Sequence, residues 1–452
     1  MNTYRKSERG QIVVIFVVAL VALLALTALA IDGGMILSDR RVAQGAADAA
    51  SLAGTGAASR ELQQGGVIYA NFTCTNSAVE SAVDEATAAA ISRAAGNNYP
   101  ALDEDLADNH GVEVVCNNDP THFQKYIDVK TVITAQTNTS FAHLFNNGPM
   151  KNTVTAVARL YPQTNVAYGF AIASLGSTCE NNEGGVDFVG GADMIVIGGG
   201  IFSNSCFTFG GSGSVDSDGG IAYAGGEQTY DCGPGTDLNP CPVHNPAQMP
   251  IQTLPEPPCP APGATGTLLN STNGGTINPG NYDEIRLGNN ETLTMNPGLY
   301  CIYGGITING GTWNAGSDAG DGVTIFIRAV DGGGQNPVAV SVTGSTNHIY
   351  AAKADHTASI AAGAVPGVLF QMKSDLDATI SLSGNGDSNF AGLIYAPSGN
   401  VELTGTSGHG GGQTYNTQVI AGYVNVGGTA SVQINFDNER PVDIPPYLNL
   451  QR

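Results

Sequence analysis

Closely spaced acidic residues are the first groups in this sequence that could do chemistry. They form three pairs: Asp216 and Asp218, Asp318 and Asp321, and Asp375 and Asp377. The first two pairs lie in the Gly-rich segments DSDGG and GSDAGDG, and hard cations such as Ca²⁺ bind loop carboxylates and carbonyls. Neither segment matches an EF-hand loop. Asp216, Asp218, Asp318 and Asp321 are therefore candidate Ca²⁺ ligands, with solvated turn residues as the commoner alternative, and we assign no metal.

Catalytic motifs are absent from the sequence, which has no GxSxG, no P-loop and no HExxH. Enzymes that cleave acidic polysaccharides combine paired carboxylates with Arg or Lys side chains that bind the substrate's acidic groups. Between residues 165 and 437 the basic residues are few and dispersed: Arg286, Arg328, Lys353 and Lys373. We therefore predict no catalytic residues, no cofactor and no enzymatic activity.

The cysteine count favours disulfide bonds. The eight cysteines are Cys74, Cys116, Cys179, Cys206, Cys232, Cys241, Cys259 and Cys301. None forms a CxxC pair or a Cys/His cluster with zinc spacing, and an even number in an exported chain is typical of disulfides. Cys232 and Cys241 bracket a short loop and are the best single candidate pair, while free buried thiols are the alternative.

The charge and the glycines are unevenly distributed. Of the 39 acidic and 17 basic residues, 22 and 4 lie between residues 165 and 437, a net charge of −18 (4 − 22). The same segment holds 50 of the 61 glycines, which places a domain boundary near Pro162–Asn165. A surface this acidic repels phosphate backbones, so nucleic-acid binding is excluded.

An uncharged segment of 20 residues runs from Ile12 to Ile31. As a helix it is about 30 Å long, the thickness of a bilayer core. Arg5, Lys6 and Arg9 precede it, so the positive-inside rule predicts that residues 1–11 are cytoplasmic and that the bulk of the chain is extracellular, or periplasmic in a two-membrane cell. The alternative is a signal peptide, because Ala28-Leu29-Ala30 resembles a cleavage site.

Small residues continue the helical pattern beyond the apolar segment. Ile36, Val42, Ala46, Ala49, Ala50 and Ala53 recur at a spacing of three to four. We predict that residues 32–60 form a helical stem that leaves the membrane, with a flat Ala/Gly face that packs on a neighbour and would allow self-assembly.

The N-terminal motifs resemble those of the TadE/TadG family of tight-adherence (Tad, Flp-type) pilus systems. The matching residues are Arg9, Gly10, Gln11, Asp32, Gly33, Arg40, Arg41 and the segment Gln44–Gly54 with Ala47, Asp48 and Ala49. The resemblance implies a retained single-pass membrane anchor. Prepilin-type cleavage after Gly10 is not expected, because the fifth residue after the cut is Ile15 rather than an acid. The DxSxS metal motif of many TadG-like proteins is absent.

Residues 61–163 are predicted to form a small α+β module. The Ala-rich segment Ser77–Ala95 is typical of an amphipathic helix. Strands are expected at 112–115, 126–137 and 154–160, with a short helix at TSFAHLF that Thr139 or Ser140 would cap.

Residues 164–437 are predicted to be an all-β, Gly-rich domain. Asn-Pro-Gly recurs at 278–280 and 296–298, and short apolar runs alternate with Gly/Asn/Ser turns. This pattern favours a right-handed β-solenoid, with a β-sandwich as the alternative. The Pro-rich insertion 240–262 would be a strap across the coils tied by Cys241 and Cys259, or a linker between two solenoid pieces. Residues 438–452 would be a tail that caps the solenoid.

These patterns predict a structural, membrane-anchored surface protein that belongs to or associates with a Tad-type pilus, in an assembly, minor pilin-like or adhesive role. The expected partners are the membrane and other pilus or envelope proteins. One alternative is a secreted β-helical carbohydrate-binding protein or polysaccharide-active enzyme. Another is a filament-forming subunit that polymerises through its N-terminal helix.

Overall fold

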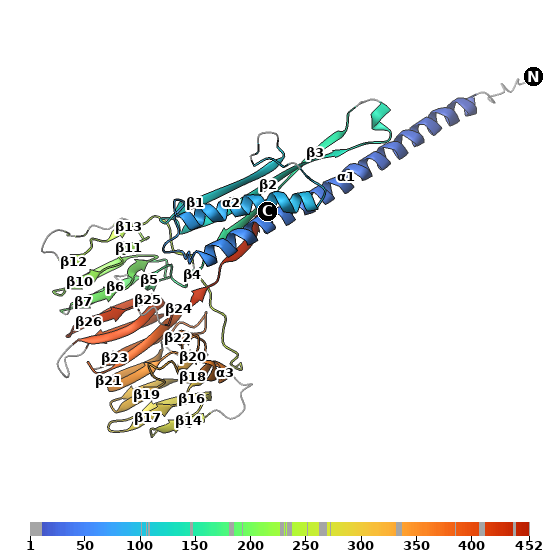
Figure 1. The fold of residues 1–452 in the computed structure, drawn as a ribbon. Helices are drawn as coiled ribbons and strands as arrows, with labels where there is room; N and C mark the ends of the chain where they lie inside the picture. The colour runs from blue at the N-terminus through green and yellow to red at the C-terminus, as the bar shows by residue number, and fades with distance from the viewer. Residues whose placement is uncertain are drawn as a thin grey trace, which may run out of the picture. The chain divides into compact units, whose positions relative to one another are not determined.

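The computed structural model describes residues 11–451 apart from 101, 105, 107–108, 145–147, 180–184, 192, 227–229, 231, 233–236, 251, 262–268, 272, 331–336, 385, 406–411 and 437–439. The described residues form two compact units. The first comprises those of Met1–Asn118, Gln124–Gln163 and Pro445–Arg452, and the second those of Asp119–Phe123 and Thr164–Ile444. A long N-terminal helix followed by a mostly β region, as predicted, is confirmed (Figure 1).

Helix α1 (Gln11–Gln64) is a single continuous helix whose two halves have opposite surroundings. Its large apolar side chains up to Ile31 are exposed, whereas small residues from Ala43 onward are buried. The buried residues recur every three or four positions, so they lie on one face: Ala43, Ala46, Ala47, Ala50, Ala57, Ala58 and Leu62. The helix predicted over 32–60 is the second half of α1, and its small-residue face lies in the core of the first unit.

Helix α2 (Ser77–Gly96) packs against α1 through a stripe of small side chains. Asn76 caps its N-terminus by accepting a hydrogen bond from the backbone N–H of Ala78. Its buried residues follow an i, i+4 pattern: Val79, Ala82, Ala86, Ala90 and Ala94. A Cβ at Gly54 of α1 would lie 2.7 Å from the carbonyl oxygen of Ala86, so glycine permits the close approach of the two helices.

A four-stranded sheet completes the first unit, in the order β1 (Gly111–Asp119), β2 (Gln124–Thr137), β3 (Met150–Tyr161), β28 (Tyr447–Gln451). β2 and β3 pair antiparallel, and alternate residues of each strand are buried in the same core as the two helices. β28 pairs antiparallel with β3, so the expectation that 438–452 caps the Gly-rich domain is wrong for its last residues. The partner of β28 is nearly 300 residues away, and no local pattern could reveal it.

The larger part of the second unit, Thr164–Ile444, is an insertion between β3 and β28. Its first strand, β4 (Thr164–Asn165), pairs antiparallel with its last, β27 (Asp443–Ile444). The chain therefore enters and leaves the second unit at the same place, and the first unit is completed only when the C-terminal residues return to β3.

The second unit contains a 22-stranded sheet. Its described strands pair in parallel, as Leu293 of one strand does with Trp313, 20 residues later in the chain. The strands are β5 (Phe170–Ser174), β6 (Val186–Gly190), β7 (Met194–Ile197), β8 (Gly200–Ser203), β9 (Phe207–Gly211), β10 (Val215–Ser217), β11 (Ile221–Tyr223), β12 (Leu238–Asn239), β13 (Val243–His244), β14 (Leu269–Ser271), β15 (Gly275–Ile277), β16 (Gly280–Leu287), β17 (Thr292–Met295), β18 (Gly298–Asn309), β19 (Thr312–Ala315), β20 (Val323–Ile327), β21 (Val338–Tyr350), β22 (Val368–Met372), β23 (Thr379–Gly384), β24 (Asn389–Gly405), β25 (Gln413–Gly428) and β26 (Val432–Asn435).

The long strands of this sheet bend and pair with several neighbours. β18, β20, β22, β24, β23 and β21 close a ring of parallel pairings, a six-stranded parallel barrel. Inward side chains of successive strands stack on one another in the core, for example Met295, Ala315, Ile349 and Phe390. Because buried apolar side chains follow each other through the stack, the core is continuous.

The chain enters this stack in the middle rather than at one end. β25 pairs with β24 on one side and with β5 and β6 on the other. The strands β5–β13, which come first in the sequence, therefore follow the last strands β25 and β26 in space, as Figure 1 shows by the change from red to green. The stack is completed only after residue 413.

The Pro-rich segment runs along the stack and joins its two pieces. From Met249 to Pro260 it contacts side chains of successive strands: Asn204, Tyr395, Gln371, Arg328 and Tyr303. The disulfide Cys259–Cys301 fixes its far end. The described part of the segment is thus the expected strap, but Cys241 does not tie it, because Cys241 pairs with Cys232.

The strap covers a second apolar layer on the outside of the sheet. β20 and β22 are buried on both faces, and Met249, Leu393, Tyr395 and Ile420 are among the residues of the outer cluster. The short helix α3 (Thr357–Ala361) lies against β18 on this side. The other faces carry half-exposed polar side chains in register, such as Thr307, Ser341 and Ser381.

A matched pair of glycine substitutions tests the helix packing. Gly54→Ala places a Cβ 2.7 Å from the Ala86 oxygen and 2.9 Å from Val129, so we expect it to lower the free energy of unfolding by about 1–3 kcal/mol. In Gly56→Ala the added Cβ has no atom within 4 Å. This substitution should raise the free energy of unfolding by about 0.5–1 kcal/mol, because alanine favours the helix over glycine. Urea unfolding of the detergent-solubilised protein, followed by circular dichroism, measures both. Equal effects of the two substitutions would contradict the close helix contact.

Candidate functional site: the exposed half of α1 and the Asp32 clasp

The described part of this chain does not bury the first half of α1. Every large apolar side chain from Ile12 to Ile31 is 44–71% exposed. Within the described residues α1 is the one helix that is long and apolar enough to cross a membrane, and its most apolar window is not buried at all. Burying such a surface is worth about 25 cal/mol per Å², so this half of α1 is a candidate membrane span.

Asp32 lies where this apolar half ends, and it clasps a distant turn. Its Oδ1 accepts hydrogen bonds from the backbone N–H groups of Ser140 (2.8 Å) and Phe141 (3.2 Å). Its Oδ2 accepts from Phe141 (3.0 Å) and Ala142 (2.6 Å). We call this contact the Asp32 clasp. The last of these donors, Ala142, is the first residue of the 3₁₀ turn η1 (Ala142–Leu144).

The clasp carries a negative charge at neutral pH. Burial of Asp32, which is 5% exposed, would by itself raise the pKa of the carboxyl group. The backbone donors Ala142, Ser140 and Phe141 oppose this effect, and together they hold the pKa below its ordinary value of 3.8. The folded state therefore prefers the carboxylate.

Further polar side chains join the buried half of α1 to the sheet. Asp39 accepts a hydrogen bond from the Oγ1 of Thr137 (2.7 Å), seven residues and two turns after Asp32. Ser51 donates to the Oγ1 of Thr131 (2.9 Å). Since buried polar groups must be paired, these contacts set the register of the helix on β2.

The other motif residues have different surroundings. Gly33 has no atom within 4 Å of a virtual Cβ, and Arg40 and Arg41 are exposed. Ala47 is fully buried, Ala49 is half-buried, and Asp48 accepts a hydrogen bond from Gln44 (2.8 Å). Arg9 and Gly10 lie outside the described residues, and Gln11 is the first residue of α1.

The candidate Ca²⁺ ligands serve as hydrogen-bond acceptors or lie exposed at turns. Asp216 accepts from the Nδ2 of Asn239 (2.9 Å), and Asp218 from the backbone N–H of Gly198 (2.9 Å). Asp321 accepts from Ser317, and Asp318 is 77% exposed, 3.7 Å from Arg440. Among the described residues no three His, Cys, Asp or Glu side chains come together as metal ligands. These contacts give no support to a Ca²⁺ site.

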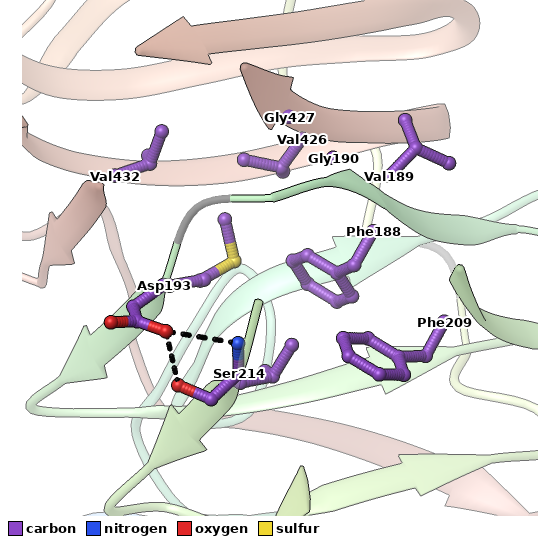
Figure 2. A pocket seen from close by; sticks show the side chains of 11 residues that line it. Phe188, Val189, Gly190, Asp193, Phe209, Ser214, Val426, Gly427 and Val432 are labelled. Carbon is purple, nitrogen blue, oxygen red and sulfur yellow. Dashed lines mark hydrogen bonds between the residues drawn. The ribbon is translucent and has the colours of Figure 1, made fainter. Parts of the chain in front are cut away.

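The best-formed pocket in the described part of the second unit lies between adjacent strands (Figure 2). Phe188 and Phe209 line it together with Val426 and Val432. Its volume is about 20 Å³, about enough for one water molecule, whereas small-molecule sites have about 300–1,000 Å³. Its one carboxylate, Asp193, accepts hydrogen bonds from the backbone N–H and the hydroxyl group of Ser214. The pocket is thus a packing gap rather than a substrate site.

All eight cysteines form disulfides. The pairs are Cys74–Cys116, Cys179–Cys206, Cys232–Cys241 and Cys259–Cys301. The first lies in the first unit, and the other three lie in the second. Both units therefore carry the cross-links that are typical of an oxidising compartment.

Comparison with known proteins agrees with the N-terminal motifs. Residues 10–60 match the family model described as "Putative Flp pilus-assembly TadE/G-like", which confirms the resemblance. Neither the curated proteins nor the solved structures gave a match. The matched segment comprises the exposed half of α1, the Asp32 clasp and most of the buried half.

The role of Asp32 could not have been found from the sequence. Its position after an apolar segment marks the end of a membrane span, and the resemblance marked it as a motif residue. Its partners lie more than 100 residues away, in a turn with no distinctive composition. Only the packing of α1 along β2 and β3 brings them together.

The Asp32 clasp predicts a pH-dependent stability. The pKa of Asp32 is lower in the folded state than the ordinary value of 3.8. The carboxylate therefore stabilises the folded state above pH 3.8, and this stabilisation is lost as the pH falls through the folded-state pKa. Asp32→Asn removes the charge and should lower the melting temperature at pH 7 by a few degrees. The difference in melting temperature between the variant and the original protein should become smaller below pH 3.8.

Asp84→Asn is the control, because Asp84 is exposed on α2. It should leave the melting temperature unchanged at both pH values. Thermal unfolding followed by circular dichroism makes the measurement. A difference for Asp32→Asn that is the same at pH 3 and pH 7 would contradict a contribution from the carboxylate charge.

Proposed function

We propose that this protein is a membrane-anchored structural component of a Tad-type pilus system, with an assembly, minor pilin-like or adhesive role. The observation that carries the proposal is the coincidence of three features in residues 10–60. These are the match to the pilus-assembly family model, the exposed apolar half of α1, and the buried half that forms the core of the first unit. One helix thus connects a membrane span to a folded module.

The geometry favours a retained anchor over a cleaved signal peptide. Cleavage after Ala30 would make Asp32 the second residue of the mature chain. The first residues of a helix lack intrahelical partners and fray, so the clasp would lie at a mobile end. A buried carboxylate with three backbone donors is better explained by a helix that continues through it.

The disulfides support an orientation with both units outside the cytoplasm. Disulfides persist in extracellular or periplasmic space and are rare where thiols are kept reduced. Arg5, Lys6 and Arg9 precede the span and favour a cytoplasmic N-terminus. Residues 1–11 are then cytoplasmic, and the chain after Asp32 is on the outer side.

We infer that the parallel stack of the second unit is a β-solenoid. Sandwiches are built from antiparallel strands, whereas the described strands of the 22-stranded sheet pair in parallel. The strongly exposed apolar residues among the described positions of this unit are Val189, Ile195, Ile197, Val243 and Val338. They include no aromatic ring on which a sugar could stack, which supports a structural role over a glycan-active enzyme.

The alternative of a filament built on the Ala/Gly face of α1 loses its main argument. Ala46 and Ala50 of that face are buried against the chain's own α2 and sheet, so the face is unavailable to a neighbour. Polymerisation through α1 would have to use the apolar half, which the membrane covers in this proposal.

Charged substitutions in the span test the anchor. Leu20→Arg combined with Leu24→Arg should cost about 5–7 kcal/mol of insertion free energy and release the protein from membranes that are washed at high pH. Leu37→Arg is the control, because Leu37 is exposed but lies outside the span. Mass spectrometry of the native protein should find residues 11–31. A soluble protein that begins at Ile31 would overturn the proposal.

Cysteine labelling tests the orientation. Thr3→Cys and Asp84→Cys each add one free thiol to a chain whose own cysteines are all paired. A membrane-impermeant maleimide should label Asp84→Cys in cells with a permeabilised outer envelope, and Thr3→Cys only after lysis. The reverse pattern would place both units in the cytoplasm.

A further inference from the structure

The C-terminal strand β28 supplies the fourth strand of the first unit's sheet. It pairs with β3 from Tyr447–Tyr161 to Gln451–Val157. The rings of Tyr447 and Tyr161 stack with their centroids 4.6 Å apart. On the helix side Leu448 lies opposite Leu160. β28 thus binds β3 through side-chain contacts as well as through backbone hydrogen bonds.

β28 is paired along one edge only, within the described residues. It is the edge strand of the sheet, and Tyr447 and Leu448 are 41% and 43% exposed. Its backbone pairs only with β3, and its side chains contact β3 and α1. Pro445 and Pro446 precede it and have no backbone N–H, so they cannot extend its pairing.

The site that receives β28 is formed without it. β2 and β3 pair along residues 127–137 and 150–160. Arg159 of β3 forms two hydrogen bonds with Asp128 (2.7 and 2.8 Å) and lies 3.5 Å over the ring of Tyr126. An open β3 would present Leu160 and a row of unpaired backbone groups, which matches one strand in particular: the C-terminal strand of the same sequence.

We propose that β28 is exchanged between copies, so that in the assembled state β3 of one chain pairs with β28 of a neighbouring chain. The exchanged contact is identical to the one within the chain, so no new surface is required. Among the described elements of the first unit, β28 alone follows the inserted part of the second unit, and it is joined to β27 through the two prolines. Exchange therefore links two copies through strands that each chain already has.

The exchange rests on the proposed function in one respect: it needs copies side by side in a membrane or a pilus. The short connection keeps β28 at a high effective concentration next to its own β3. Neighbouring copies compete only where their local density is comparable, as in an assembly. Dilute protein in detergent should pair within the chain.

Two cysteine variants in separate chains test the exchange. Val157→Cys and Gln451→Cys occupy paired positions of β3 and β28, and neither chain alone can form the bond between them. The two chains, with different tags, are produced in the same cells, and membranes are oxidised and analysed without reductant. We expect a disulfide-linked heterodimer in membranes, and a loss of at least tenfold in its yield after dilution in detergent.

The matched control uses a strand pair that cannot exchange. Gln136→Cys and Lys151→Cys in separate chains occupy paired positions within the β2–β3 hairpin and should give no heterodimer. Val157→Cys and Gln451→Cys in one chain show that the pair can form a disulfide. A bond within that chain, with no heterodimer from the separate chains, would overturn the exchange, as would equal cross-linking by the control pair. A protein that leaves the membrane on washing would instead overturn the proposed function.

Discussion

The continuous helix α1 is the constraint on which the rest of this structure depends. Its first half exposes large apolar side chains, and its second half buries small ones. A membrane can cover the first surface, and only close contact with α2 and the sheet covers the second. Small residues such as Gly54 let the helices approach, since packing energy depends on contact rather than on side-chain size alone. The Asp32 clasp lies at the change from one environment to the other.

The insertion of the second unit explains why a large domain can be attached without disturbing this arrangement. The domain begins and ends at the paired strands β4 and β27, so β3 and β28 can remain neighbours. Entry into the middle of the stack makes its two pieces depend on each other, because β25 pairs with strands on both sides. The strap and its disulfide Cys259–Cys301 connect the same two pieces. A long-range sheet of this kind is expected to fold slowly.

The acidic residues of this protein are largely structural where their contacts are described. Asp193, Asp218 and Asp32 each accept hydrogen bonds from backbone N–H groups at turns or chain crossings. Such groups satisfy donors that the turns leave unpaired, which is a common use of Asp in Gly-rich loops. These three carboxylates therefore support the fold.

The sequence alone determined the composition-dependent features: the apolar span, the TadE/G-like segment, the Ala-rich second helix and a mostly β, Gly-rich region. Each depends on neighbouring residues, because helix periodicity, hydropathy and turn residues are local signals. The tertiary structure decided what Asp32 binds, that the face of Ala46 and Ala50 is covered by the same chain, and that residues 445–451 return to β3. It also decided that β5 follows β25 in the stack. These contacts join residues about 100 to 300 positions apart, and the pairing of distant strand edges is set by the packing of the whole chain, which no local pattern records.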